Sequence, residues 1–556
     1  MQKIFNKMLK INKFVIILFI ALLGFSAAAQ GSEIKCTLNL SDRMLDVKIE
    51  VPAGKNDKTS FNLSDWAGQL NYADNIYRVA AKDKNGNALK LEKTAARVWT
   101  VENAKKPFEL SYSVVSQKET FMGDNVRSHF HPSIFPKYAF LWGMSFLFFP
   151  ADDELLKLPV RLQINPNEYA RFYTNFEGGA DSFDDLSELF IAAGDYRVAE
   201  KTIGGRRVKF LMQGANWKFT DEEFAGTVSR IIEAQIKYMG FSPSKDDLLI
   251  TLNEGTPNSK GGTVVKNVIS VYPNPQSGLQ DFDTLKLISH EHFHFWNGSY
   301  WRDAGDKKEG YYKWMSEGFT EYYAGLTLYR ENLITEKQFV AWLNELLLQY
   351  QTNPHAMTAT AEILAEKYWE SQDYNRLPYV KGAILGFLTD LQIRQKTANK
   401  KQIDDLMKLL IGKTDLKKGY DDKLLLANFD AVSQIDNRQS YNDFMLGARH
   451  LPITEVLKAS EIAAPEQTRE LFDLGFTTES GRMERGARIR EVTSQSALDA
   501  GLKPGDELRG YSFVGGRPQE QASFTVLRGE QTVQLKYFPK KTINILQIDE
   551  NAKIPR

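Results

Sequence analysis

Hydrophobic and polar residues alternate in short runs from about Ser32 to Pro166. Residues 44–49 (Met-Leu-Asp-Val-Lys-Ile) and 108–114 are two such runs, and Asn85-Gly86-Asn87 is one of the turn signals that separate them. Successive side chains of a strand point to opposite faces, so this pattern predicts an N-terminal domain of antiparallel β structure.

The hydrophobic period changes to that of a helix near Asp221. Apolar residues then recur three or four positions apart, and a glycine follows at 240, which predicts a helix that ends there. Strand-like runs follow at 248–252 and 264–271. From about 283 to 459 the pattern is mainly helical, as in 336–350 and 403–411. We therefore expect an α/β segment that leads into a helical one.

The first thirty residues have the pattern of an export signal. Lysines at 3, 7, 10 and 13 precede an apolar run at 14–25, and Ala27-Ala28-Ala29 offers the small residues of a cleavage site. The run is short for a permanent transmembrane helix, which leaves an uncleaved anchor as the alternative. No later stretch reaches transmembrane length. We expect a signal peptide at 1–29 and a mature protein in the periplasm or outside the cell, with no stable membrane span.

Composition narrows the function classes further. The 556 residues exceed what one compact core holds, so two to four domains are expected. The 70 Lys and Arg residues balance 70 Asp and Glu residues, and this zero net charge argues against a nucleic-acid partner. The single cysteine, Cys36, excludes an internal disulfide and is interpreted as a half-buried strand residue.

A candidate metal site begins at residues 290–294, His-Glu-His-Phe-His, which satisfy the pattern H-E-x-x-H. His290 and His294 lie one helical turn apart and can bind one zinc ion together. Glu291 lies about 100° further around the helix, where it can act as a general base without being a ligand. His292 points off this face and is interpreted as a packing or surface residue.

A third ligand is predicted at Glu317, in the segment Trp314 to Tyr323, which we expect to form a second helix from about Ser316. Two nitrogens and one carboxylate with an open fourth position are typical of a catalytic zinc site, whereas a structural site more often has a fourth protein ligand. Glu321, one turn further, is either a carboxylate that orients a ligating histidine or a solvent-facing charge. The predicted cofactor is one zinc ion per chain.

These motifs resemble the glycyl aminopeptidase family, zinc peptidases with a PDZ domain that are related to aminopeptidase N. Residues 290–297 are similar to the family's H-E-x-F-H-x-W-N, and residues 314–323 to its W-x-x-E-G-x-T-x-Y-Y, whose glutamate is the third zinc ligand. The segment of Tyr379 with Lys381-Gly382-Ala383 is similar to the tyrosine segment that stabilises the tetrahedral intermediate. The resemblance implies a thermolysin-like catalytic domain and a catalytic role for Tyr379.

The chain departs from this family at one position. The resemblance places Gly261, Gly262, Thr263 and Val264 where the family has G-G-L-E, whose glutamate helps to hold the substrate's free amino group. A valine cannot pair with an ammonium group, although the strand edge could still bind an extended peptide. The departure leaves endopeptidase action open beside aminopeptidase action, and Glu254 or Glu321 could substitute for the missing carboxylate.

The region from Leu474 to Leu508 resembles a bacterial PDZ domain. Its loop at Leu474, Gly475 and Phe476 could capture a peptide carboxy terminus, or the domain could pack on the catalytic domain and shape substrate access. Asp473 stands where a glycine is common in such loops.

Together these observations predict a multidomain α+β protein. Its expected parts are the signal peptide (1–29), an N-terminal β domain (30–175), a zinc metallopeptidase domain (176–462), a PDZ-like domain (463–545) and a tail (546–556). The expected partners are peptide or protein substrates. The alternative from another class is a peptide-binding module with a nearly silent zinc site. The sequence gives no indication of the oligomeric state.

Overall fold

The structure is a computed structural model, and it describes residues 32–64, 71–116, 129–244, 246–255, 261–298, 302–305, 307–413 and 418–556. The predicted signal peptide lies outside these residues. The chain divides into two compact units, Met1–Lys237 with Phe241–Phe295, and Tyr238–Gly240 with Trp296–Arg556. Among the described residues, no helix combines the length and the hydropathy needed to cross a membrane.

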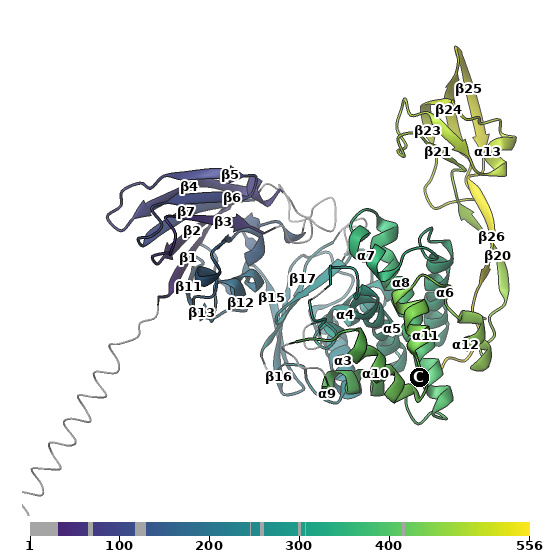
Figure 1. The fold of residues 1–556 in the computed structure, drawn as a ribbon, viewed down its shortest axis with the longest axis horizontal. Coiled ribbons are helices and arrows are strands. Elements are labelled where there is room, and N and C mark those ends of the chain that lie inside the picture. The colour runs from purple at the N-terminus through teal and green to yellow at the C-terminus, as the bar shows by residue number, and fades with distance from the viewer. Residues whose placement is uncertain are drawn as a thin grey trace, which may run out of the picture. The chain divides into compact units, whose positions relative to one another are not determined.

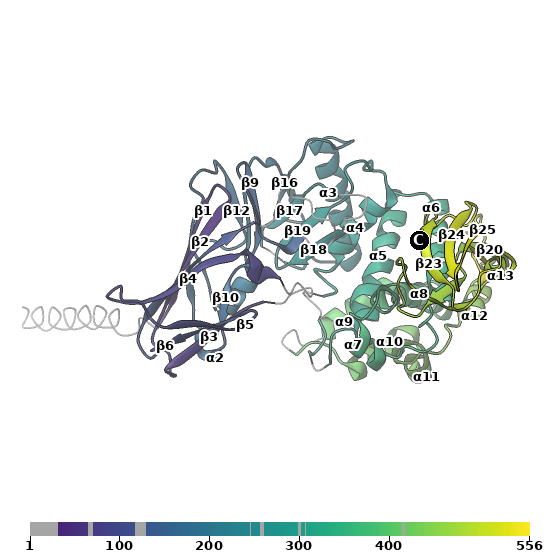
Figure 2. The ribbon, with the colours of Figure 1, turned by 90° about the horizontal axis from the view of Figure 1, so that it is seen from above.

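The first unit is mainly β structure, as the alternating pattern predicts (Figures 1 and 2). Three of its sheets carry the N-terminal strands. In sheet order these are β13 (Gly179–Ala180), β11 (Val160–Asn165), β1 (Ile34–Ser41), β2 (Met44–Val51), β7 (Phe108–Val115) and β4 (Ile76–Asp83); β10 (Phe148–Pro150), β3 (Lys58–Leu63), β6 (Val98–Glu102) and β5 (Leu91–Ala95); and β12 (Phe172–Thr174), β14 (Phe190–Gly194), β9 (Tyr138–Trp142) and β8 (Ser133–Phe135).

Most of these neighbouring strands are antiparallel, but β1 and β11 pair in parallel, with Ile34 opposite Val160. The inward-facing residues of β1 and β2, such as Leu38 and Val47, are buried in one hydrophobic core. Cys36 on β1 belongs to this core and is fully buried rather than half-buried.

The fourth sheet of the first unit is a five-stranded mixed sheet that precedes the candidate ligands in the chain. Its order is β15 (Arg197–Ile203), β16 (Arg206–Met212), β17 (Leu248–Leu252), β19 (Val268–Tyr272) and β18 (Gly261–Val265), so β18 is an edge strand. The run predicted at 264–271 is instead part of a hairpin, because Lys266 adopts a left-handed conformation (φ 51°) and reverses the chain. Helix α3 (Asp221–Met239) ends at Gly240, as predicted, and α4 (Phe282–Phe293) packs against β18 and β19.

The second unit begins with helices, as the sequence predicts. They are the π-helical turn η6 (Trp314–Phe319), then α5 (Thr320–Arg330), α6 (Glu336–Thr352), α7 (Ala361–Lys367), α8 (Gln372–Lys396), α9 (Ile403–Lys413), α10 (Asp422–Ser433), α11 (Arg438–Ser440), η7 (Tyr441–Leu446) and α12 (Ile453–Ala459). Buried aromatic and aliphatic side chains hold them together, among them Tyr322, Phe339 and Phe387.

The C-terminal segment has its own small hydrophobic core, which includes Ile489, Leu508 and Phe524. Strands β20 (Glu466–Phe472) and β26 (Lys540–Leu546) run side by side (Figure 1). The elements between them are β21 (Phe476–Thr478), β22 (Ile489–Val492), α13 (Gln495–Asp499), β23 (Glu507–Ser512), β24 (Ala522–Arg528) and β25 (Gln531–Tyr537). Side chains of α6 bind the backbone at the end of this segment: Asn344 bonds both the N–H and the C=O of Ile548.

Candidate metal centre

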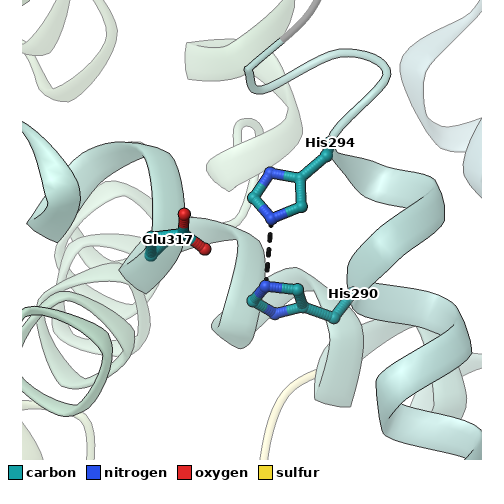
Figure 3. Close-up of side chains that lie close together, drawn as sticks. All are labelled: His290, His294 and Glu317. Carbon is teal, nitrogen blue, oxygen red and sulfur yellow. Dashed lines mark hydrogen bonds between the residues drawn. The ribbon is translucent and has the colours of Figure 1, made fainter. Parts of the chain in front are cut away.

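The two candidate histidine ligands lie at the end of helix α4: His290 is in its last turn and His294 is its C-cap residue. Its first turn is capped by Asp281, whose carboxylate accepts a hydrogen bond from the backbone N–H of Thr284 at 3.0 Å. Leu285 and Ile288 on one side of the helix are buried. This packing aims His290 and His294 in one direction, so that their Nε2 atoms lie 3.1 Å apart (Figure 3).

The third candidate ligand, Glu317, lies on the π-helical turn η6 that precedes α5. Single π-helical turns are frequent at functional sites because they change the direction of side chains within a helix. The buried side-chain amide of Asn297 donates to the carbonyl oxygen of Met315 (2.9 Å) and to Oγ1 of Thr320 (3.1 Å). Asn297 therefore fixes this turn to the segment that follows the two histidines.

Ligand atoms of His290, His294 and Glu317 all lie within 4.8 Å of one another, and Figure 3 shows both imidazole rings and the carboxylate pointing toward a common point. Two imidazole nitrogens and one carboxylate oxygen are the donor set of a catalytic zinc site. Among the described residues, these three form the one cluster of His, Cys, Asp or Glu side chains that lie close enough together to hold a metal ion. The residues therefore fit a zinc ion.

Glu291, the predicted general base, is buried beside strand β18 and is not one of these three ligands. A Cβ added to Gly262 would lie 2.8 Å from Cγ and 3.1 Å from Oε1 of Glu291. Since a real Cβ does not approach so closely, only glycine fits at 262 while Glu291 keeps this position.

His292 is a packing residue. It is buried, and its Nδ1 lies 2.7 Å from Oε1 of Gln235. Burial, aided by the nearby charge of Arg206, lowers the pKa of His292 to about 3, so the imidazole is neutral at physiological pH.

Val264 lies on the same face of β18 as Gly262, because side chains two positions apart in a strand share a face. That face of the strand is directed toward Glu291. Glu254 binds a different segment of the chain. Its Oε1 accepts hydrogen bonds from the backbone N–H groups of Ala215 (3.2 Å) and Asn216 (3.3 Å).

Tyr379 is half-buried on helix α8, which crosses the turn that carries Glu317. The two helices touch through glycines: a Cβ added to Gly382 would lie 2.7 Å from Cα of Gly318. The hydroxyl of Tyr368 is hydrogen-bonded with Tyr379, and burial raises the pKa of Tyr368. Glycine at both positions permits the close approach of these helices.

Glu321 is buried and does not face solvent. Its Oε1 lies 3.4 Å from a guanidinium nitrogen of Arg376. Glu317 also has a basic neighbour, because Nζ of Lys313 donates to its Oε1 at 3.0 Å. Sequence reasoning missed both cations. Spacing along the helices could have found them, because residues three or four positions apart are neighbours on a helix surface. Lys313 precedes Glu317 by four residues, and Arg376 precedes Tyr379 by three.

The loop predicted to capture a carboxy terminus binds the carboxylate of Asp473, the residue that precedes it. The backbone N–H of Gly475 donates to Oδ1 of Asp473 at 2.7 Å, and the carbonyl oxygen of Leu474 accepts from the hydroxyl of Tyr537 at 2.6 Å. Gly475 has φ 77°, and Phe476 is buried. The amide of Gly475 is therefore already satisfied within the chain.

Two family models match segments of this chain. The model of the M61 glycyl aminopeptidases matches residues 283–384, and that of the peptidase M61 N-terminal domain matches residues 34–190. These matches confirm the resemblance drawn from the zinc motifs and support a peptidase. No curated protein matches the chain in sequence.

Among solved structures, an aminopeptidase N family protein from Idiomarina loihiensis is similar over 93% of this chain and 98% of its own, with a TM-score of 0.72 and 18% identity. An M1 zinc metallopeptidase from Deinococcus radiodurans covers 76% of this chain and 94% of its own, with a TM-score of 0.45 and 14% identity. At 18% identity, the first similarity shows a common fold.

Proposed function

Because the chain carries the N-terminal and peptidase segments of the M61 glycyl aminopeptidase family, we propose that it is an exported, zinc-dependent metallopeptidase with aminopeptidase-like action. The observation that carries the proposal is the convergence of His290, His294 and Glu317 within 4.8 Å. Its substrates are peptides or proteins, cleaved in the periplasm or outside the cell after removal of residues 1–29.

One zinc ion per chain would be held by these three residues. When bound, zinc supplies Lewis-acid chemistry and lowers the pKa of a water ligand to about 7.

Glu291 is the proposed general base. Its carboxylate takes the proton of the attacking water and later gives a proton to the departing amine. Its burial against Gly262 limits the positions available to the carboxylate and excludes bulk water from one side. A fixed base at the site of attack contributes about 10²–10⁴-fold to the rate.

Tyr379 is the proposed donor to the oxyanion that forms on the scissile carbonyl. A preorganised donor stabilises this charge in the transition state by about 3–4 kcal/mol. The support for Tyr379 is its place on α8, the helix that packs through Gly382 against the turn of Glu317.

Strand β18 is the proposed substrate-binding edge, formed by Gly261, Gly262, Thr263 and Val264. Its position at the edge of the sheet leaves one side available for an extended peptide, which would bind by strand addition. The apolar side chain of Val264 on the face toward Glu291 favours a second candidate, endopeptidase action. An ammonium group bound there would lack a counter-charge from β18.

The C-terminal segment, residues 463–545, is proposed to be a PDZ-like domain. Asp473 already satisfies the amide of Gly475, which supports a role in shaping substrate access rather than in capturing carboxy termini.

A digest of a mixed peptide pool tests the proposed function. Peptides with free and with acetylated amino termini are incubated with the zinc-loaded protein or with Glu291→Gln, and the products are read by mass spectrometry. We expect cleavage by the first protein and none by the second. Equal product from both would refute the role of Glu291, and no product from either would favour a peptide-binding module.

The same digest separates the two candidate actions. Shortening of free-ended peptides alone indicates an aminopeptidase, whereas internal cuts in acetylated peptides indicate an endopeptidase. Val264→Glu adds a carboxylate and is expected to raise the preference for free amino termini by at least tenfold, which corresponds to about 1.4 kcal/mol. Val264→Gln, of the same shape without the charge, is the matched control.

A further inference from the structure

Arg376 lies one turn before Tyr379 on helix α8 and contacts two other helices, α5 and α6. Its guanidinium carbon is 5.5 Å from the ring centroid of Tyr379, within the range of a cation–π interaction. One terminal nitrogen lies 3.4 Å from Oε1 of Glu321 on α5, and Nε lies 3.3 Å from Oε1 of Gln349 on α6. A planar guanidinium can make these contacts together because its donors are held in a fixed fork.

The contact with Glu321 joins Arg376 to a buried carboxylate on α5. The Glu321 side chain is 3% exposed, and a buried carboxylate requires a positive or hydrogen-bonding partner. Glu321 follows Glu317 by four residues, so Arg376 connects the helix of the proposed metal ligand with the ring of Tyr379. The Arg376 side chain itself is 38% exposed, which is consistent with a place at the margin of the packed core.

Tyr379 is contacted from two directions. Arg376 packs over its ring, and the Tyr368 hydroxyl is hydrogen-bonded with it. A tyrosine side chain has two rotatable bonds that set the place of its hydroxyl, so a contact on the ring and one at the hydroxyl restrict both. A hydroxyl that donates to a developing oxyanion works only when it is fixed before the reaction.

We propose that Arg376 is a positioning residue for Tyr379, which it holds in place relative to the continuous helical segment η6–α5 that carries Glu317 and Glu321. The proposal rests on the proposed function, in which Tyr379 is the oxyanion donor. Arg376 acts through Tyr379 and does not itself touch the reacting atoms. Its loss is therefore expected to lower kcat, while KM and zinc content stay unchanged.

A double-mutant cycle tests this inference on the zinc-loaded protein. Arg376→Met is made in the wild-type protein and in Tyr379→Phe, which keeps the ring and removes the hydroxyl. Misplacement of a catalytic group by about 1 Å costs up to about 100-fold, so Arg376→Met alone is expected to lower kcat by roughly 10- to 100-fold. In the Tyr379→Phe background it is expected to change kcat by less than about twofold, because the hydroxyl that it positions is already absent.

Two control variants and two physical measurements complete the test. Arg376→Lys preserves the charge but not the fork and is expected to recover only part of the lost kcat. Lys396→Met removes a cation from the exposed far end of the same helix and is expected to leave kcat unchanged. Zinc per chain and the circular dichroism spectrum show whether each variant is folded and loaded.

The outcomes separate this inference from the proposed function. If Arg376→Met lowers kcat by the same factor with and without the Tyr379 hydroxyl, the positioning role is wrong while the peptidase stands. If Tyr379→Phe retains full kcat, Tyr379 is not the donor and both the donor role and this inference fall. A rise in KM with unchanged kcat would make Arg376 a substrate-binding residue instead, which also overturns the proposal.

Discussion

Gly382→Ala tests whether stability and activity depend on the close crossing of α8 and the turn of Glu317. The added Cβ would collide with the carbonyl oxygen of Trp314, and it would lie 2.7 Å from Cα of Gly318 and 2.8 Å from the carbonyl carbon of Trp314. All of these are backbone atoms, which cannot turn aside as a flexible side chain can. Ordinary van der Waals contact begins at 3.4 Å, and the Trp314 oxygen lies closest of the three, so α8 and the turn of Glu317 must separate by more than about 1 Å.

This displacement has two expected costs. Overpacking of a tight core costs about 1–3 kcal/mol, and the better helix propensity of alanine offsets up to about 1 kcal/mol of it. A net loss of about 1–2 kcal/mol in the free energy of unfolding is expected. Because the crossing also sets Tyr379 relative to Glu317, a shift of about 1 Å or more is expected to lower kcat by up to about 100-fold.

The assay compares urea unfolding and peptide hydrolysis for the wild-type protein, Gly382→Ala and Gly226→Ala. Gly226 lies within α3, and a Cβ there meets nothing within 4 Å. The control should be neutral or gain up to about 1 kcal/mol. Wild-type stability and wild-type kcat in Gly382→Ala would refute the reasoning, because they would mean that the crossing absorbs the methyl group at no cost.

Three other predictions follow from buried groups. Asn297→Ala removes the amide that donates to the carbonyl oxygen of Met315, so we expect a loss of about 1–3 kcal/mol in the free energy of unfolding by urea and less zinc per chain by metal analysis. Burial lowers the pKa of Lys381 from 10.5 to about 8. Between these two pH values the unfolded state binds more protons than the folded state, so the free energy of unfolding should rise with pH by about 3 kcal/mol across this window. Urea titrations at pH 7.5 and 10 should show this rise in the wild-type protein and not in Lys381→Met. Burial raises the pKa of Cys36 to about 12, so a thiol reagent at pH 8 should label it only after unfolding; labelling of the folded protein would contradict its burial.

The sequence determined the local features of this protein. The four-residue spacing of His290 and His294 places both on one helical face whatever surrounds the helix, because 3.6 residues make one turn. Likewise, alternation in residues 44–49 predicted strand β2, and the helical period with Gly240 predicted α3. These signals need no partner from elsewhere in the chain.

Tertiary structure decided which separate segments meet. Strand β1 pairs in parallel with β11, more than a hundred residues away, and the contact of Arg376 with Glu321 joins two helices 55 residues apart. The left-handed backbone at Lys266, which turns one predicted strand into a hairpin, also carries no glycine to signal it. Such contacts depend on the packing of whole elements, where a shift of one residue exchanges the buried and exposed faces of a strand. Periodicity along the chain therefore identifies the helices that carry the candidate ligands, and only packing brings their side chains together.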